Sequence, residues 1–323
     1  MAGLINNIIG HDKNKDRLLG LISQKRWPHA FLFVGPHSIG KYKMALACSQ
    51  MLVCQDSETS CGVCGPCLRI AKEQSENLLK VSPDTSLAKP VIKVEAIRSV
   101  LDSLSLSSLG GARVVLIDQA HRMNAQAANA LLKSLEEPFE NVYFFLIGPD
   151  TQQFLSTIRS RCQVMVFQGL ETDDLKKIKS GLPEWAYAAS RGQIENLLQL
   201  TSTAGIERRT ESYQLLEQFL SDKEFLLKSS WRTLVKDKSW TLSTISAWLQ
   251  ILYVAIKSQA SENEEMQSIP DQHQSYFNQV MEVTSKKLLK LFDDLVSAEK
   301  DILGNMDPVL LLEKIWVGYA RVG

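Results

Sequence analysis

Short apolar runs separated by longer amphipathic segments occupy the first half of the chain. Five of these runs have the length and apolar content of buried strands. They lie at residues 29–35, 77–81, 113–118, 142–147 and 163–167. Segments between them place apolar residues at helical spacing, so strands and helices alternate. Such alternation predicts a parallel sheet covered by helices on both faces.

Three helices are predicted between these strands. Residues 41–53 and residues 94–104 carry apolar side chains at positions that one face of a helix would bury. Asn124 can cap a third helix, which runs to Glu137 and stops at Pro138. The expected core of the first half is therefore a sheet with these helices packed against it.

Strand patterns are not found beyond about residue 168. Residues 170–205 have the pattern of a small helical unit, and the chain from there to residue 323 is amphipathic and helix-rich. The polar stretch at residues 258–274 predicts a loop. Four tryptophans are expected to anchor the helical packing: Trp231, Trp240, Trp248 and Trp316. The expected fold class is α/β followed by all-α.

Length and charge narrow the possible functions. A chain of 323 residues is expected to form two or three domains. Its 36 basic and 36 acidic side chains cancel, which argues against a protein that wraps DNA by itself. No run of roughly 18 apolar residues predicts a membrane span, and residues 1–12 do not resemble a secretory signal. We therefore expect a cytoplasmic protein with reduced thiols.

Residues 35–41 read G-P-H-S-I-G-K and match the phosphate-loop motif G-x-x-x-x-G-K between a predicted strand and a predicted helix. In such a loop the backbone N–H groups and the helix N-terminus face the phosphates, and Lys41 would reach the β- and γ-phosphates. The alternative is a chance glycine turn, and the strand–helix context argues against it. Tyr42 follows where the motif has Ser or Thr, and its oxygen lies several bonds too far out to bind Mg²⁺. We expect Gly35, Gly40 and Lys41 to bind ATP or ADP weakly, without a productive Mg²⁺ site.

Four cysteines, Cys54, Cys61, Cys64 and Cys67, have the spacing C-x6-C-x2-C-x2-C. Two-residue spacers let neighbouring thiolates converge on one tetrahedral metal, and four thiolates suit a structural Zn²⁺. A disulfide would conflict with the expected compartment, and a chance cluster of free thiols is the remaining alternative. The other two, Cys48 and Cys162, are expected to be small packed residues.

Several segments together resemble a known family, the bacterial clamp-loader subunits of DNA polymerase III. The resemblance covers residues 4–205. The segments are P-H-A-F-L-F at residues 28–33, the phosphate loop, the four-cysteine insertion, the strand that ends at Asp118, A-N-A-L-L-K-S-L-E-E-P at residues 128–138, and I-R-S-R-C at residues 158–162. The family includes ATP-hydrolysing motor subunits of the gamma/tau type and a delta-prime type.

The resemblance implies three domains. Residues 1–168 would be a RecA-like AAA+ domain with the zinc knot at 54–67, residues 169–206 a helical lid, and residues 207–323 a helical collar that assembles a five-subunit ring. The family opens a sliding clamp and loads it on primed DNA, driven by ATP. The implied partners are gamma/tau-type motor subunits and the delta subunit, with the clamp and primer-template DNA reached through the complex.

The resemblance also assigns a role to Arg161. The Arg of the family's S-R-C motif is an arginine finger, which enters the ATP site of the neighbouring subunit and stabilises charge on the γ-phosphate. Arg159, two positions away, is a competing assignment. The plainer alternative is that Arg161 pairs with a local carboxylate.

Four positions depart from the active AAA+ pattern. Tyr42 is the first. Asp118 could contact the metal, but Gln119 follows where an active site has Glu, and an amide cannot accept a proton as a carboxylate does. Asp118 could also be only a turn former at the end of a strand.

The third and fourth departures lie further along the chain. Gly148 and Pro149 follow the fourth strand where a Thr or Asn would sense the γ-phosphate, and Thr151 would need a backbone shift to substitute. Glu195 replaces the Arg of the lid pattern G-x-x-R. Together the departures predict a chain that does not hydrolyse ATP by itself but keeps Arg161, as the delta-prime type does.

Two other functions remain as alternatives. One is an ATP-hydrolysing gamma/tau-like subunit with a variant site, which Gln119 and Glu195 disfavour. The other is a zinc-dependent nucleic-acid-binding module with a vestigial AAA+ fold, which the zero net charge disfavours.

Overall fold

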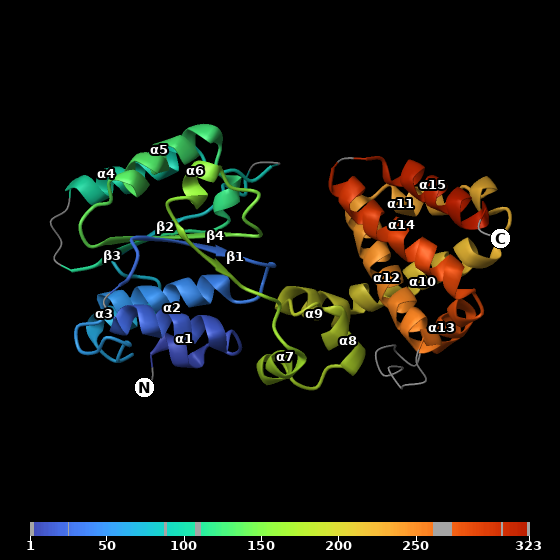
Figure 1. The fold of residues 1–323 in the computed structure, drawn as a ribbon, viewed down its shortest axis with the longest axis horizontal. Coiled ribbons are helices and arrows are strands. Elements are labelled where there is room, and N and C mark those ends of the chain that lie inside the picture. Colours follow the sequence, from blue (N-terminus) through green and yellow to red (C-terminus); the bar gives the residue numbers. More distant parts are fainter. Residues whose placement is uncertain are drawn as a thin grey trace. The chain divides into compact units, whose positions relative to one another are not determined.

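The computed structural model describes residues 3–24, 26–86, 89–106, 111–260, 273–304 and 306–321. The chain folds into two compact units, Met1–Ile178 and Lys179–Gly323 (Figure 1). The first unit contains a sheet with its helices, and every regular element among the described residues of the second unit is a helix. The predicted combination of an α/β part and an all-α part is confirmed.

The sheet of the first unit has five parallel strands in the order β2-β3-β4-β1-β5. The strands are β1 (Ala30–Val34), β2 (Leu78–Val81), β3 (Arg113–Ile117), β4 (Val142–Gly148) and β5 (Gln163–Val166). All five strand predictions are confirmed to within two residues at each end. Every residue of β1 and β3 is buried, because helices cover both faces of the sheet.

Successive residues of β1 point to opposite faces and enter two separate cores. Phe31 and Phe33 pack with α1 (Asp12–Ser23) and α2 (Lys41–Val53) on one face. Leu32 packs with α4 (Val94–Leu106) and α5 (Ala125–Glu136) on the other (Figure 1). The cap predicted for α5 is present, since Asn124 Oδ1 accepts a hydrogen bond from Ala127 N at 2.7 Å. Shorter elements of this unit are η1 (Leu4–Asn7), α3 (Gly65–Ala71), η2 (Ala120–Arg122), α6 (Ser156–Arg159) and α7 (Thr172–Ile178).

The second unit is a helical assembly with an aromatic core. Trp231 and Trp248 are fully buried, Trp240 is buried and Trp316 packs against the same cluster, as predicted. The helices are α8 (Glu184–Ala189), α9 (Ile194–Thr201), α10 (Thr203–Ser221), η3 (Phe225–Leu227), α11 (Ser230–Val235), α12 (Lys238–Ala260), α13 (Gln274–Met281), α14 (Ser285–Leu303) and α15 (Pro308–Arg321).

Helix α12 is the centre of this unit. It is the one described helix long and apolar enough to cross a membrane by length and composition alone, but 61% of its most apolar window is buried inside the protein. Its burial against α10 and α14 explains the apolar composition. The loop predicted at residues 258–274 begins too early, because α12 continues to Ala260. Residues 261–272 of that prediction lie outside the described residues.

The boundary between the units falls inside the expected lid. Within residues 169–206, α7 belongs to the first unit, whereas α8, α9 and the first turn of α10 belong to the second. The division into three domains therefore remains a prediction.

Candidate functional site

The phosphate loop joins β1 to α2, as predicted. Gly40 caps α2 with φ of 100°, a left-handed conformation that glycine adopts without strain. Gly35 lies so close to β5 that a Cβ there would stand 2.1 Å from the carbonyl oxygen of Phe167. A side chain at Gly35 would clash, and one at Gly40 would strain the backbone. The loop thus follows the path between strand and helix that the motif needs.

Lys41 folds back onto its own loop. Its ammonium group donates to the carbonyl oxygen of Gly35 at 2.6 Å and to that of Pro36, and the residue is 6% exposed. Burial lowers the pKa of Lys41 to about 8, although the charge of Asp118 acts in the opposite direction. These two hydrogen bonds direct the Lys41 ammonium onto its own loop and use two of its three N–H groups.

Tyr42 points toward the end of α3. Its hydroxyl donates to Glu73 Oε2 at 2.6 Å, and the same carboxylate oxygen lies 3.0 Å from Lys80 Nζ. The hydrogen bonds from Tyr42 and Lys80 lower the pKa of Glu73 despite its partial burial. The only side-chain oxygen at the metal-binding position of the loop is thus bound to a carboxylate at the end of the cysteine-bearing segment.

Asp118 and Gln119 follow β3 at the carboxyl edge of the sheet. Asp118 Oδ1 accepts a hydrogen bond from Gln119 N at 2.9 Å, which is the contact of a strand-terminal turn. Gln119 has φ of 48°, an uncommon conformation for a residue with a side chain. The proximity of Asp118 to Lys41, indicated by their electrostatic interaction, joins this edge to the phosphate loop.

Gly148 ends β4 at the same edge, next to β1. A Cβ at Gly148 would lie 2.4 Å from the ring of Phe154, so a polar side chain cannot be accommodated without moving that ring. His121 also lies beside this glycine, and its buried Nδ1 has no hydrogen-bond partner. Burial and the nearby charges of Arg122 and His37 lower the pKa of His121 to about 4, so the ring is neutral at pH 7.

Arg161 follows α6 and is about one-third exposed. Its Nη2 lies 2.7 Å from Glu136 Oε1, and its Nη1 donates to the carbonyl oxygen of Thr157 at 2.9 Å. The local-carboxylate alternative is therefore present in this chain. Arg161 Nη1 also lies 3.3 Å from Ser160 Oγ. Because the guanidinium has five N–H groups and these contacts use at most three of them, the pairing does not exclude a further anionic partner.

The four predicted cysteines converge on one point. Their sulfur atoms all lie within 4.8 Å of one another, and no disulfide links any of the six cysteines. About 3.8 Å separates two sulfurs of a tetrahedral zinc site with the usual bond length, so small shifts would suffice. The N–H groups of Cys61 and Cys64 donate to Cys54 Sγ and Cys61 Sγ, both at 3.3 Å, as donors to metal-bound thiolates do. The cluster could therefore hold a metal ion. Cys48 and Cys162 are buried outside it, as predicted.

The predicted residues lie in four separate places. The structure gathers Gly35, Gly40, Lys41 and Asp118 at one edge of the sheet, with Gln119 and Gly148 beside them. The cysteine cluster forms the second group, and Arg161 stands apart with Glu136. Glu195 lies in the first turn of α9, in the second unit. The sequence analysis missed Glu73, the partner of Tyr42, since no local pattern marks it.

Comparison with known proteins identifies the family. A parallel sheet with a phosphate loop after its first strand defines a phosphate-loop α/β protein, here followed by a helical C-terminal region. Residues 10–171 match the family model described as "DNA polymerase III, delta subunit". The chain belongs to this family, as a delta-prime-type clamp-loader subunit.

Individual relatives agree with this assignment. The DNA polymerase III subunit delta' of Pseudomonas aeruginosa is 29% identical over 91% of this chain and 92% of its own length. The subunit delta' of Bacillus subtilis is 26% identical over 92% of each. The subunit tau of Escherichia coli is 32% identical over 53% of this chain, but the match spans only 26% of the tau subunit.

Proposed function

We propose that this chain is a non-hydrolysing subunit of the clamp-loader ring that supplies Arg161 to the ATP site of a neighbouring motor subunit. The observation that carries the proposal is the position of Tyr42. Its hydroxyl is bound to Glu73, so the position after Lys41 has no short hydroxyl to hold Mg²⁺. Without the metal, charge on the γ-phosphate would not be neutralised during transfer.

Further features support the loss of hydrolysis. Gln119 cannot act as the base, Phe154 fills the space beside Gly148, and the Lys41 ammonium is bound to loop carbonyls. Each missing contribution to phosphoryl transfer can cost orders of magnitude in rate. The chain by itself is then not an ATPase, and ATP or ADP would bind weakly if at all.

The proposed role of Arg161 needs a guanidinium that is exposed and reoriented at low cost. Its ion pair with Glu136 joins two partly exposed side chains. Exposed pairs of this kind contribute about 0.2–1 kcal/mol, which is small beside the effect of an arginine finger on phosphoryl transfer. The Glu136 carboxylate would hold Arg161 near the surface until the phosphates of the neighbour replace it.

The remaining assignments follow from the family. The proposed partners are gamma/tau-type motor subunits and the delta subunit, with the sliding clamp and primer-template DNA engaged through the complex in the cytoplasm. Residues 169–206 would act as the lid and residues 207–323 as the collar. Cys54, Cys61, Cys64 and Cys67 would hold one structural Zn²⁺ that fixes the segment between α2 and α3.

Reconstitution tests the proposal. The purified chain is mixed with its motor and delta partners, and the complex mass and the ATPase rate are measured. We expect one stable complex, an ATPase rate that depends on this chain, and no turnover by the chain alone. Turnover by the chain alone that disappears in Lys41→Ala would instead identify a hydrolysing gamma/tau-like subunit. Tight, salt-sensitive DNA binding without partners would identify a nucleic-acid-binding module.

A further inference from the structure

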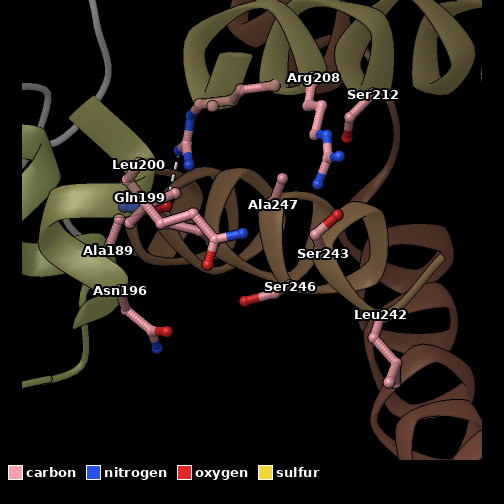
Figure 2. A pocket seen from close by; sticks show the side chains of 13 residues that line it. Ala189, Asn196, Gln199, Leu200, Arg208, Ser212, Leu242, Ser243, Ser246 and Ala247 are labelled. Carbon is pink, nitrogen blue, oxygen red and sulfur yellow. Dashed lines mark hydrogen bonds between the residues drawn. The ribbon is translucent and has the colours of Figure 1, made fainter. Parts of the chain in front are cut away.

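The second unit contains a pocket rich in hydrogen-bond donors, far along the chain from the phosphate loop. It has a volume of about 280 Å³ and is lined by residues of α8, α9, α10 and α12 (Figure 2). Two arginines, Arg208 and Arg209, contribute to the lining, and none of the thirteen described lining residues carries a carboxylate. The pocket is therefore positively charged.

Arg209 is a buried cation that forms no ion pair within the described residues. It is 4% exposed, it lies over the ring of Trp185 at 4.7 Å, and its Nη2 donates to Gln250 Oε1 at 2.6 Å. Its Nε has no hydrogen-bond partner. A buried charge without an opposite charge is costly, which points to an anion that completes the site.

Ser212 supplies the second observation. It lies on α10 one turn after Arg208, it is 1% exposed, and its buried hydroxyl oxygen has no partner. Figure 2 shows Arg208 reaching from α10 toward Ser243 of α12, with Ser212 next to it. Ser243 and Ser246 of α12 both line the pocket. The hydroxyl of Ser243 already donates to the carbonyl oxygen of Trp240 at 2.7 Å. Guanidinium and hydroxyl groups from α10 and α12 therefore line the same pocket.

The number and kind of donors select the class of anion. A single carboxylate carries one charge and would be satisfied by one guanidinium fork. Two arginines with the hydroxyls of Ser212 and Ser246 instead match a group with two negative charges and several acceptor oxygens. Planar guanidinium groups suit phosphate oxygens in particular.

We propose that this pocket binds a dianionic phosphate group, with Arg208 and Arg209 as its charged contacts and Ser212 as a hydroxyl donor. The volume accommodates a free phosphate, a pyrophosphate or the phosphate end of a small phosphomonoester. The site is separate from the phosphate loop and does not depend on the proposed arginine finger.

Calorimetric titration of the full chain at constant ionic strength tests the site with three probes, namely inorganic phosphate, pyrophosphate and AMP. We expect saturable binding of at least one probe, and the one that binds best identifies the source of the phosphate group. Arg208→Gln should weaken this binding about tenfold or more, because a charged hydrogen bond is lost. Lys223→Gln, which removes an exposed cation of the same unit away from the pocket, should leave it unchanged.

Ser212→Ala separates binding from folding. Removal of a buried hydroxyl without a partner should leave the melting temperature unchanged or raise it, while phosphate binding weakens severalfold. Absence of saturable binding for all three probes would overturn the proposal. Equal binding by wild type, Arg208→Gln and Ser212→Ala would overturn it as well, since the phosphate would then bind elsewhere.

Discussion

The hydroxyl of Tyr42 lies 2.6 Å from Glu73 Oε2 and connects the first turn of the phosphate-loop helix to the end of α3. Burial raises the pKa of Tyr42 well above its usual value, and the Glu73 carboxylate adds to the shift. The tyrosine is therefore a neutral hydrogen-bond donor at pH 7. At the position where the nucleotide-binding pattern has a metal-binding hydroxyl, Tyr42 instead forms a structural hydrogen bond to Glu73.

The first prediction concerns this contact. Tyr42→Thr restores a short hydroxyl to the phosphate loop but removes the hydrogen bond to Glu73. We expect no ATPase activity from the purified variant, because Gln119 and Gly148 still lack the groups that hydrolysis needs. The free energy of unfolding should fall by about 1 kcal/mol or more from the lost hydrogen bond and ring packing.

Denaturant titration and a phosphate-release assay measure the two effects of Tyr42→Thr. Tyr42→Phe is the matched control, since it keeps the ring and removes only the hydroxyl. Magnesium-dependent turnover by Tyr42→Thr alone would show that the other departures are not disabling.

The second prediction concerns the cysteine cluster. Elemental analysis should find about one zinc per chain if four thiolates form one closed site. Cys64→Ser should lower both the zinc content and the melting temperature, because the segment between α2 and α3 loses its cross-link. Cys48→Ala keeps all four proposed ligands and should keep the zinc. A metal-free wild-type protein prepared without chelators would count against the site.

The third prediction concerns His273, which is 1% exposed beside Arg209. Burial, with a smaller effect from Arg209, lowers the pKa of His273 from 6.5 to about 4. Above pH 6.5 the ring is neutral in both the folded and the unfolded chain, so its effect on stability is constant. Between pH 6.5 and 4 the unfolded chain takes up the proton but the folded chain does not. The free energy of unfolding therefore decreases as the pH is lowered, by at most about 3 kcal/mol.

Denaturant titrations at pH 7 and pH 4.5 test this expectation. His273→Gln removes the titrating group and should reduce the difference in stability between the two pH values. His11→Gln is the control, since His11 is a half-buried histidine of the first unit. An unchanged pH dependence in His273→Gln would contradict the assignment.

Much of the fold could be predicted because the local patterns agree with the tertiary structure. The strands of the sheet are short apolar runs, and Asn124 caps α5 where the sequence predicts it. Helix α1 was missed because its sequence is largely polar and its N-cap, His11, is not a usual capping residue. Helix α3 was missed because Gly65 and Pro66 predict a turn, although Pro also fits the first turn of a helix.

The sequence predicts those parts of the candidate site whose residues lie close together in the chain at a characteristic spacing. The convergence of the four cysteines follows from their spacing. The contacts between Tyr42 and Glu73 and between Arg161 and Glu136 join residues from different elements, so no local pattern specifies them. The pocket beside Arg209 arises from four helices and has no counterpart in any single segment.

The central claim is that Arg161 completes the ATP site of a neighbouring subunit. In the reconstituted loader, Arg161→Ala is compared with two controls, Arg159→Ala, which tests the competing arginine, and Glu136→Gln, which removes only the local ion pair. The measurement is the ATPase rate in the presence of clamp and primed DNA, with complex mass as a check on assembly. Both controls should stay within a few fold of wild type, because an exposed ion pair contributes little.

Arg161→Ala should lower hydrolysis at the site it enters by about a thousandfold or more, with the ring still assembled. The total ATPase rate of the loader should fall accordingly. An assembled Arg161→Ala complex with the ATPase rate of the wild type would contradict the account.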